Sequence, residues 1–243
     1  MIRTERAADG DYRIVTLDRP EARNALAPAD LDALAAAVAE ADEPAVLLRG
    51  AGSAFCAGAD LDVVADLDDP ASFAAHGQRV ATTIESADPV VVAGVDGAAR
   101  GGGVELALAC DLRVATPAAT FAETGVAIGL FGAWGGTARL PRVVGEGVAL
   151  DLACSARVLD AEAALATGLV SRVVDDPAAV AREVADNDPE AVATTRRLVR
   201  AGARGESTEA DERAAFARLH DERFGDDDGI EAPDRGTGDD RKG

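Results

Sequence analysis

Residues 95–106, with the sequence VDGAARGGGVEL, decide the fold. They follow the apolar run Val90–Val95, which is typical of a buried strand, and they open the apolar segment 103–109, which is typical of a helix. Glycines at a helix start leave backbone N–H groups unpaired, with the positive end of the helix dipole behind them. The loop is therefore expected to attract negative charge. The purely structural interpretation is a tight turn, with Glu105 stabilising the first turn of the helix.

A second glycine-rich stretch, residues 49–60 with the sequence RGAGSAFCAGAD, follows the apolar run 45–48. It contains a G-x-G-x-x-F pattern. A dinucleotide-binding loop has glycine in place of Phe55 and leads into a helix, whereas no clear helix is predicted directly after this stretch. The small residues Ala57, Gly58 and Ala59 favour a different interpretation, in which a ligand approaches the backbone closely.

Together, the two glycine-rich stretches predict a catalytic site. Each follows a buried strand, so each can bring one backbone N–H to a common point, and Glu105 would supply a carboxylate beside it. Two N–H groups that converge in this way form an oxyanion hole. The chemistry that such a site serves is stabilisation of an enolate.

Short apolar runs alternate with longer helical patterns along the chain, which is typical of an α/β fold with a covered sheet. We expect strands at Tyr12–Leu17, 45–48, Val90–Val95, Leu112–Ala115 and 169–174. We expect helices from Pro28 onward and at 72–85, 103–109, 147–154, Ala161–Ala166, 178–185, 191–200 and 209–222. The acidic tail, 225–243, is expected to be mobile unless a partner orders it.

Charge limits the classes of partner. The 243 residues include 24 Lys and Arg against 44 Asp and Glu, a net charge of −20, and Lys242 is the only lysine. Nucleic acid is not expected as a partner because there is no basic stripe. This composition favours adaptation to high salt, and a GC-rich genome is the alternative. No apolar run approaches the ~20 residues of a membrane span, and no signal peptide is recognised, so we expect a cytoplasmic protein without membrane contact.

Cysteine and histidine offer little chemistry. Cys56, Cys110 and Cys154 are widely spaced and form neither a disulfide framework nor a CxxC site. His76 and His220 are far apart and belong to no metal-binding motif or Ser-His-Asp arrangement. We therefore expect no metal.

The chain resembles the enoyl-CoA hydratase/isomerase, or crotonase, superfamily. The resemblance runs over roughly residues 10–230 and is carried, in order, by the segments 17–26, 54–61, 97–111, 135–142 and 166–170. It implies a crotonase (ClpP-like) α/β spiral of β-β-α repeats with two sheets over residues 1–190. It also implies a C-terminal helical trimerisation region over 191–224, and homotrimers that often pair into hexamers.

The resemblance further implies an acyl-CoA thioester as the substrate, with coenzyme A part of the substrate and no other cofactor. By position, the N–H groups of Ala59 and Gly102 would hold the thioester oxygen, and Glu105 matches the first of two glutamates in the family's hydratases. Segment 22–24 is similar to the one that lines the path of coenzyme A. The residues expected to bind coenzyme A or the acyl group are Ala22, Arg23, Ala57, Gly58, Asp60, Leu61, Gly101 and Trp134.

The second glutamate of the family falls where this chain has Gly125. Glu123 is the candidate replacement, because residues 123 and 125 of an extended segment point to the same side. Its alternative is a solvated loop carboxylate. Gly132 stands where proline is usual. Trp134 replaces a small residue and either narrows the acyl pocket or fills a gap in the core.

The function expected from this resemblance is hydration of a 2-enoyl-CoA. One alternative is isomerisation of the double bond, or another crotonase reaction that needs a single carboxylate. Another is a non-catalytic protein that binds acyl-CoA.

Overall fold

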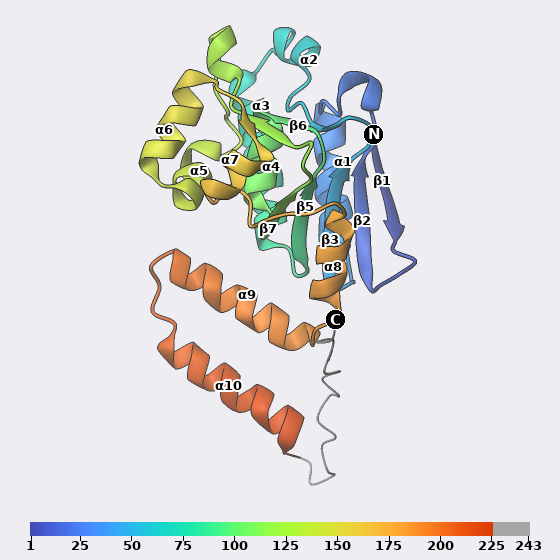
Figure 1. Ribbon diagram of the computed structural model, residues 1–243, viewed down its shortest axis with the longest axis vertical. Helices are drawn as coiled ribbons and strands as arrows, with labels where there is room; N and C mark the ends of the chain where they lie inside the picture. The colour runs from blue at the N-terminus through green and yellow to red at the C-terminus, as the bar shows by residue number, and fades with distance from the viewer. Residues whose placement is uncertain (226–243) are drawn as a thin grey trace, which may run out of the picture. The chain divides into compact units, whose positions relative to one another are not determined.

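The computed structural model describes residues 1–225, and most of the acidic tail predicted at 225–243 lies outside them (Figure 1). The chain divides into two compact units, Met1–Ala193 and a second that begins at Thr194. The roles expected for segments 1–190 and 191–224 remain predictions. Among residues 1–225 we find no helix with the length and the apolar character that crossing a bilayer requires.

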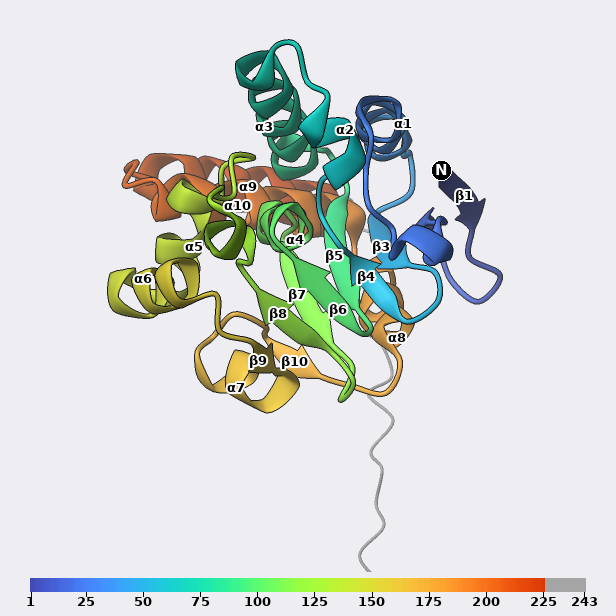
Figure 2. The same ribbon diagram turned by 90° about the horizontal axis from the view of Figure 1, so that it is seen from above.

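Two sheets form the first unit (Figures 1 and 2). The larger sheet has the order β1 (Ile2–Arg6), β2 (Tyr12–Leu17), β3 (Ala45–Gly50), β5 (Val90–Val95), β7 (Leu112–Ala115), β10 (Arg172–Val173). The smaller sheet has the order β4 (Ala54–Cys56), β6 (Ala98–Arg100), β8 (Thr120–Ala122), β9 (Leu159–Asp160). All pairs of neighbouring strands are parallel except β1 with β2 and β8 with β9.

A spiral connects the two sheets. Three times, a strand of the larger sheet is followed within a few residues by a short strand of the smaller one, in the pairs β3 and β4, β5 and β6, and β7 and β8. The helices between and after these strands are η1 (Pro20–Ala22), α1 (Pro28–Ala39), α2 (Leu61–Ala65), α3 (Pro70–Ser86), α4 (Gly102–Ala109), η2 (Gly125–Ile128), α5 (Gly136–Val144), α6 (Glu146–Ser155), α7 (Ala161–Ala166) and α8 (Pro177–Ala185).

Helix α4 lies inside the first unit, which positions the candidate site. Every residue from Gly103 to Ala109 is buried, and the helix packs against β4, β6, α3 and α5 (Figure 2). A helix that is apolar on all sides is expected to be buried in this way. The one acidic residue that it carries, Glu105, is consequently held in the core.

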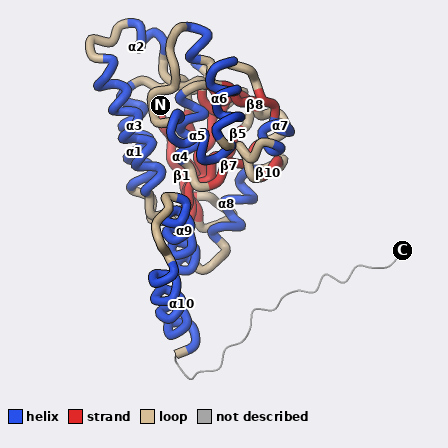
Figure 3. The backbone as a smooth tube through the Cα atoms, turned by 90° about the vertical axis from the view of Figure 1, so that its left-hand side faces the viewer, coloured by secondary structure: helices blue, strands red, loops and turns tan. Residues whose placement is uncertain are grey.

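In the described part of the second unit, a short loop joins two helices (Figure 3). It contains most of α9 (Pro189–Ala203) and all of α10 (Glu209–Phe224), and Arg218 on α10 donates to Thr194 Oγ1 on α9 at 3.3 Å. Apolar side chains stay exposed on both helices, including Val199 and Phe216.

The sequence predicts most of the helices and several of the strands, but helix α5 and strand β1 were not predicted. Strands β2, β5 and β7 and helix α7 have their predicted bounds, and the other predicted helices shift by at most a few residues. Segment 169–174 was expected to be a strand, but only Arg172–Val173 pairs. The expectation that no helix follows the loop 49–60 is wrong, because the Asp60 carboxylate accepts the Asp62 N–H and caps α2.

Candidate functional site

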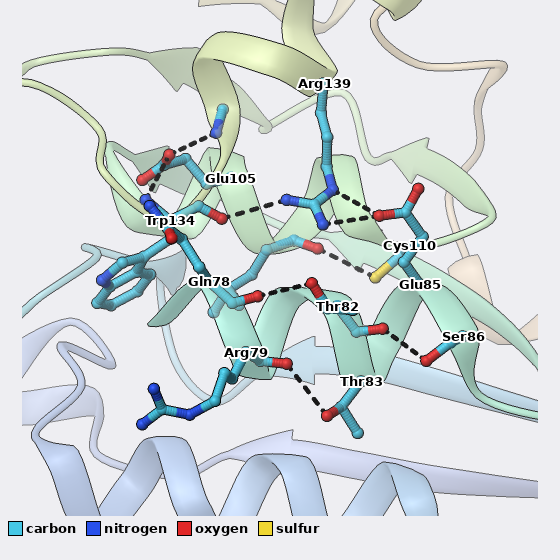
Figure 4. A network of polar contacts seen from close by, with 12 residues as sticks. Gln78, Arg79, Thr82, Thr83, Glu85, Ser86, Glu105, Cys110, Trp134 and Arg139 are labelled. Carbon is cyan, nitrogen blue, oxygen red and sulfur yellow. Dashed lines mark hydrogen bonds and ion pairs between the residues drawn. The ribbon is translucent and has the colours of Figure 1, made fainter. Parts of the chain in front are cut away.

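Glu105 projects from the buried helix α4 and is 1% exposed. Its Oε1 accepts two backbone N–H groups, from Trp134 at 2.9 Å and from Gly136 at 2.6 Å (Figure 4). No hydrogen bond to Oε2 is found within residues 1–225. Burial raises the pKa of Glu105, while the two N–H donors and the charge of Arg139 act in the opposite direction. Oε1 is thus fixed by the backbone, and Oε2 is left for a ligand.

Two glycines make room for this carboxylate. A Cβ at Gly132 would lie 2.8 Å from the Glu105 Cδ, and a Cβ at Gly136 would lie 2.8 Å from both Cγ and Oε1. Any larger residue at either position would collide with the side chain. The departure from proline at 132 is therefore part of the fit around Glu105.

Glu123 follows strand β8 directly and is 8% exposed, so it is not the solvated carboxylate of the alternative interpretation. Its Oε1 is buried, and no hydrogen-bond partner for it is found among residues 1–225. Burial, together with the charge of Glu105, raises the pKa of Glu123 to about 8. At neutral pH, a carboxyl group with this pKa is mostly protonated.

The two glutamates line one cavity of about 290 Å³. Its other walls come mainly from η2, the loop 131–132, α5 and α6. The lining residues are Gly125, Val126, Phe131, Gly132, Gly136, Thr137, Leu140, Pro141, Glu146, Ala149, Leu150 and Ala153. The cavity thus combines two carboxyl groups with walls that suit an apolar chain.

Gly125, which stands where the resemblance places the second glutamate, lines the same cavity. Residues 125–128 form η2, and Leu130 N–H donates back to the Gly125 carbonyl at 2.9 Å. A Cβ at Gly125 would lie 2.9 Å from the Phe131 Cα. A glutamate at 125 is incompatible with this turn.

The two glycine-rich loops meet, as their sequence predicts. A Cβ at Gly58, where φ is +89°, would lie 2.8 Å from the Arg100 carbonyl oxygen and 2.9 Å from Gly102 N. Gly101 at the end of the second loop donates its N–H to Ala122 O at 3.0 Å, which ties this loop to β8. Only glycine permits the approach at residue 58.

The N–H groups of Ala59 and Gly102 are both available. Ala59 forms a parallel bridge with Leu26, whose bonds run from Leu26 N–H to Gly58 O and from Asp60 N–H to Leu26 O. In this pattern the Ala59 N–H points away from Leu26, and no partner for it is found among the described residues. Gly102 is the first residue of α4, whose first-turn amides have no partner within the helix.

Asn24 holds the first loop, a role that the sequence pattern did not reveal. Its side-chain NH₂ donates to the carbonyls of Ala51, Ala54 and Phe55, and its Oδ1 accepts the N–H of Arg19. Arg23 and Asn24 both have left-handed φ values, 53° and 57°, which are uncommon outside glycine. These two backbone angles mark the segment as unusual, but they are visible only in the structure and not in the sequence.

The other expected binding residues surround the same loop. Ala22 ends η1, Arg23 accepts the N–H of Ala57 on its carbonyl, and Leu61 is 58% exposed at the start of α2. Asp60 forms an ion pair with Arg19 at 2.7 Å, and this hydrogen-bonded pairing lowers the pKa of Asp60. Segments 22–26, 57–61 and 100–102 are thus brought together.

Trp134 fills the core. Its indole is 3% exposed and lies where a Cβ at Gly77 or at Gly102 would be, 2.0 Å from Cδ1 and 2.4 Å from Cζ3 respectively. It also meets Phe73 edge to face, with the ring centroids 6.0 Å apart. Trp134 does not line the cavity of the two glutamates, so of its two interpretations the structure favours the filling of a gap between α3 and α4.

Within residues 1–225, no cluster of His, Cys, Asp or Glu has the geometry to hold a metal ion. The arrangement offers two buried carboxyl groups and two backbone N–H groups for which no partner is found among the described residues. These are the groups that proton transfer beside a carbonyl needs.

A family profile, curated relatives and solved structures all show similarity between this chain and enoyl-CoA hydratases. The sequence profile of the enoyl-CoA hydratase/isomerase family matches residues 12–235. The short-chain-enoyl-CoA hydratase of Clostridium acetobutylicum is 34% identical over 207 residues, which are 80% of this chain and 79% of the relative. The crotonyl-CoA hydratase of Syntrophomonas wolfei is 41% identical over 168 residues, which are 66% of this chain and 65% of the relative. A solved enoyl-CoA hydratase from Bacillus anthracis superposes with a TM-score of 0.81 at 30% identity, over 89% of each chain.

Proposed function

Because the chain belongs to the enoyl-CoA hydratase/isomerase family, we propose that it is an enoyl-CoA hydratase, which adds water across the double bond of a 2-enoyl-CoA. Its α/β fold of β-β-α repeats is that of its structural relatives. The observation that carries the proposal is the pair of buried glutamates in one apolar cavity, since hydration needs both a base and an acid.

Glu105 is the base of the proposed reaction. A water molecule bound at its Oε2 attacks the β-carbon of the substrate, and the carboxylate takes the proton that the water loses. The electron pair of the double bond moves toward the thioester, and its carbonyl becomes an enolate. Fixing Oε1 with two N–H donors keeps the other oxygen aimed at the cavity.

Glu123 is the acid. Its raised pKa keeps it protonated near neutral pH, and it transfers its proton to the α-carbon as the enolate collapses. The net addition is hydroxyl at the β-carbon and hydrogen at the α-carbon. Afterwards Glu105 holds a proton and Glu123 is ionised, so one proton returns from Glu105 to Glu123 before the next turnover.

The N–H groups of Ala59 and Gly102 hold the enolate oxygen. Gly102 precedes Glu105 by three residues on α4, a rise of about 4.5 Å, so that one helix positions both the thioester oxygen and the attacking water. Removing one donor of such a hole costs about 2.7–4 kcal/mol of transition-state stabilisation.

The proposed substrate is a short 2-enoyl-CoA, because relatives are named for short-chain enoyl-CoA and crotonyl-CoA hydration. Coenzyme A enters as part of the substrate, and the reaction needs no other cofactor. Its proposed contacts are made by the loops that meet beside Ala59 and Gly102, namely Ala22, Arg23, Ala57, Gly58, Asp60, Leu61 and Gly101.

The experiment that tests the proposal is turnover of crotonyl-CoA in high salt, measured by the loss of absorbance of the conjugated thioester. We expect Glu105→Gln and Glu123→Gln each to slow the reaction by about 10²–10⁴-fold. A 3-enoyl-CoA assayed for the appearance of conjugation tests the isomerase alternative. Binding of crotonyl-CoA without turnover of either substrate would instead establish the acyl-CoA-binding alternative.

We also propose that the chain assembles into a homotrimer or a hexamer made as a dimer of trimers. Large apolar side chains exposed on η2 and the following loop support an interface, with Ile128 59% and Phe131 68% exposed. Light scattering after gel filtration in high salt tests this proposal, and a monomer would refute it.

The proposed setting is a salt-rich cytoplasm. A net charge of −20 with a single lysine supports adaptation to salt, and three free cysteines fit a reducing compartment. Activity and unfolding temperature that rise steeply with salt concentration would support this, whereas full activity in dilute buffer would contradict it.

A further inference from the structure

The loop 133–136, which holds the Glu105 carboxylate, is itself held by side chains from α3 and α5 (Figure 4). We propose that Gln78 and Arg139, the latter anchored by Glu85, are positioning residues that fix this loop and through it the catalytic oxygen of Glu105. The inference rests on the proposed function, because it assigns these residues to the reaction of the same site.

Gln78 acts on Glu105 through one peptide unit. Its side-chain Nε2 donates to the Ala133 carbonyl at 2.9 Å, and the N–H of that same peptide, on Trp134, donates to Glu105 Oε1 at 2.9 Å. Hydrogen bonds in a chain polarise one another. Donation by Gln78 therefore makes the Trp134 N–H a stronger donor to the carboxylate, even though Gln78 does not touch Glu105.

Arg139 holds the next part of the loop. Its Nη1 donates to the Trp134 carbonyl at 3.2 Å, and its Nε and Nη2 donate to Glu85 Oε2 at 3.0 and 2.7 Å. The loop is shaped around the guanidinium, because a Cβ at Gly135 would lie 2.2 Å from Nη1. The Arg139 side chain is only 12% exposed, so its position is set by these contacts.

Within residues 1–225, Arg139 is the cation whose charge favours the ionised form of Glu105. On the cavity side lie the carboxyl groups of Glu123, at the end of β8, and Glu146, at the start of α6. Glu85 on α3 is bound to Arg139, and Cys56 on β4 carries a neutral thiol, since burial raises its pKa to about 12. Arg100 on β6 turns to the carbonyls of Ala99 and Thr120.

Loss of either positioning residue is expected to shift the pKa of Glu105 in one direction. Weaker donors and a lost cation both disfavour the carboxylate, so the pKa of Glu105 rises. Glu105 acts as a base in the ionised form, and the acid limb of the pH profile of kcat/KM therefore moves to higher pH. A residue that only stabilised the fold would lower activity at every pH without moving that limb.

The test compares Gln78→Met, Arg139→Met and Arg139→Lys with the exposed controls Arg79→Met and Arg142→Met. Two quantities are measured on the whole chain, the pH profile of kcat/KM for crotonyl-CoA and the titration of the Glu105 carboxyl by ¹³C NMR. A Glu105→Gln sample identifies the signal. We expect upward shifts of about 0.5 pH unit for Gln78→Met and about 1 for Arg139→Met.

We expect the Glu105 pKa of Arg139→Lys to lie between those of wild type and Arg139→Met, because lysine keeps the charge but cannot make the forked contacts. If the variants lose activity or stability while the Glu105 titration stays with the two controls, the positioning role is refuted. An inert wild type would refute the proposed hydratase instead, and the NMR titration would still decide whether Gln78 and Arg139 act on Glu105.

Discussion

Replacement of Glu123 by glutamine is expected to change the pH dependence of stability. The folded protein raises the pKa of this carboxyl from 4.5 to about 8, because it is buried and faces the charge of Glu105, and no partner for its Oε1 is found among residues 1–225. Between these pH values the folded state binds more protons than the unfolded state, so the free energy of unfolding falls as the pH rises. The whole difference corresponds to about 5 kcal/mol, which is absent below pH 4.5 and complete above pH 8.

Glutamine has nearly the same shape and cannot ionise. We therefore expect urea unfolding at fixed salt and protein concentration to show wild type losing about 4 kcal/mol more than Glu123→Gln between pH 5 and pH 9. Glu146→Gln is the matched control, since it removes an exposed carboxylate from the same cavity. If wild type and Glu123→Gln lose stability in parallel over this range, the carboxyl is not buried in the way the structure describes.

Three further substitutions test the packing around the site. Gly77→Ala is expected to cost about 1–3 kcal/mol in urea unfolding, because its methyl group overlaps the indole of Trp134. Asn24→Ala leaves three carbonyls without their donor, so we expect a loss of about 2 kcal/mol or more, together with a higher KM for crotonyl-CoA. Gly125→Glu is expected not to restore turnover to an enzyme that lacks the acid at 123, because its Cβ collides with Phe131; rescue in the hydration assay would overturn this account of the turn.

The sequence predicts the parts of the site that depend on local pattern. Glycines after a buried strand mark the two loops, and an acidic residue in an otherwise apolar helix marks Glu105. These signals lie within a few residues of the group they predict. The strands β4, β6 and β8 were missed because three residues are too few to show a period of two.

The rest of the site depends on contacts between distant segments. Burial of Glu123 requires the turn of η2 and the side chains of α5 and α6, and none of these is visible in the sequence around residue 123. The place of Trp134 depends in the same way on Gly77, which no pattern in the sequence singles out. Tertiary packing thus decides both the burial of Glu123 and the position of Trp134.

The three short strands of the smaller sheet carry a consequence for how this scaffold acquires new chemistry. Ala59, Gly102 and Glu123 each come within three residues after the end of β4, β6 or β8, which run parallel. Each turn of the spiral thus places one loop residue, which can be exchanged for another, at the same edge of the smaller sheet. An acid can be moved by changing one loop while the larger sheet keeps its sequence. In this scaffold, the residues that select a reaction lie in the loops after β4, β6 and β8, apart from the strands of the larger sheet.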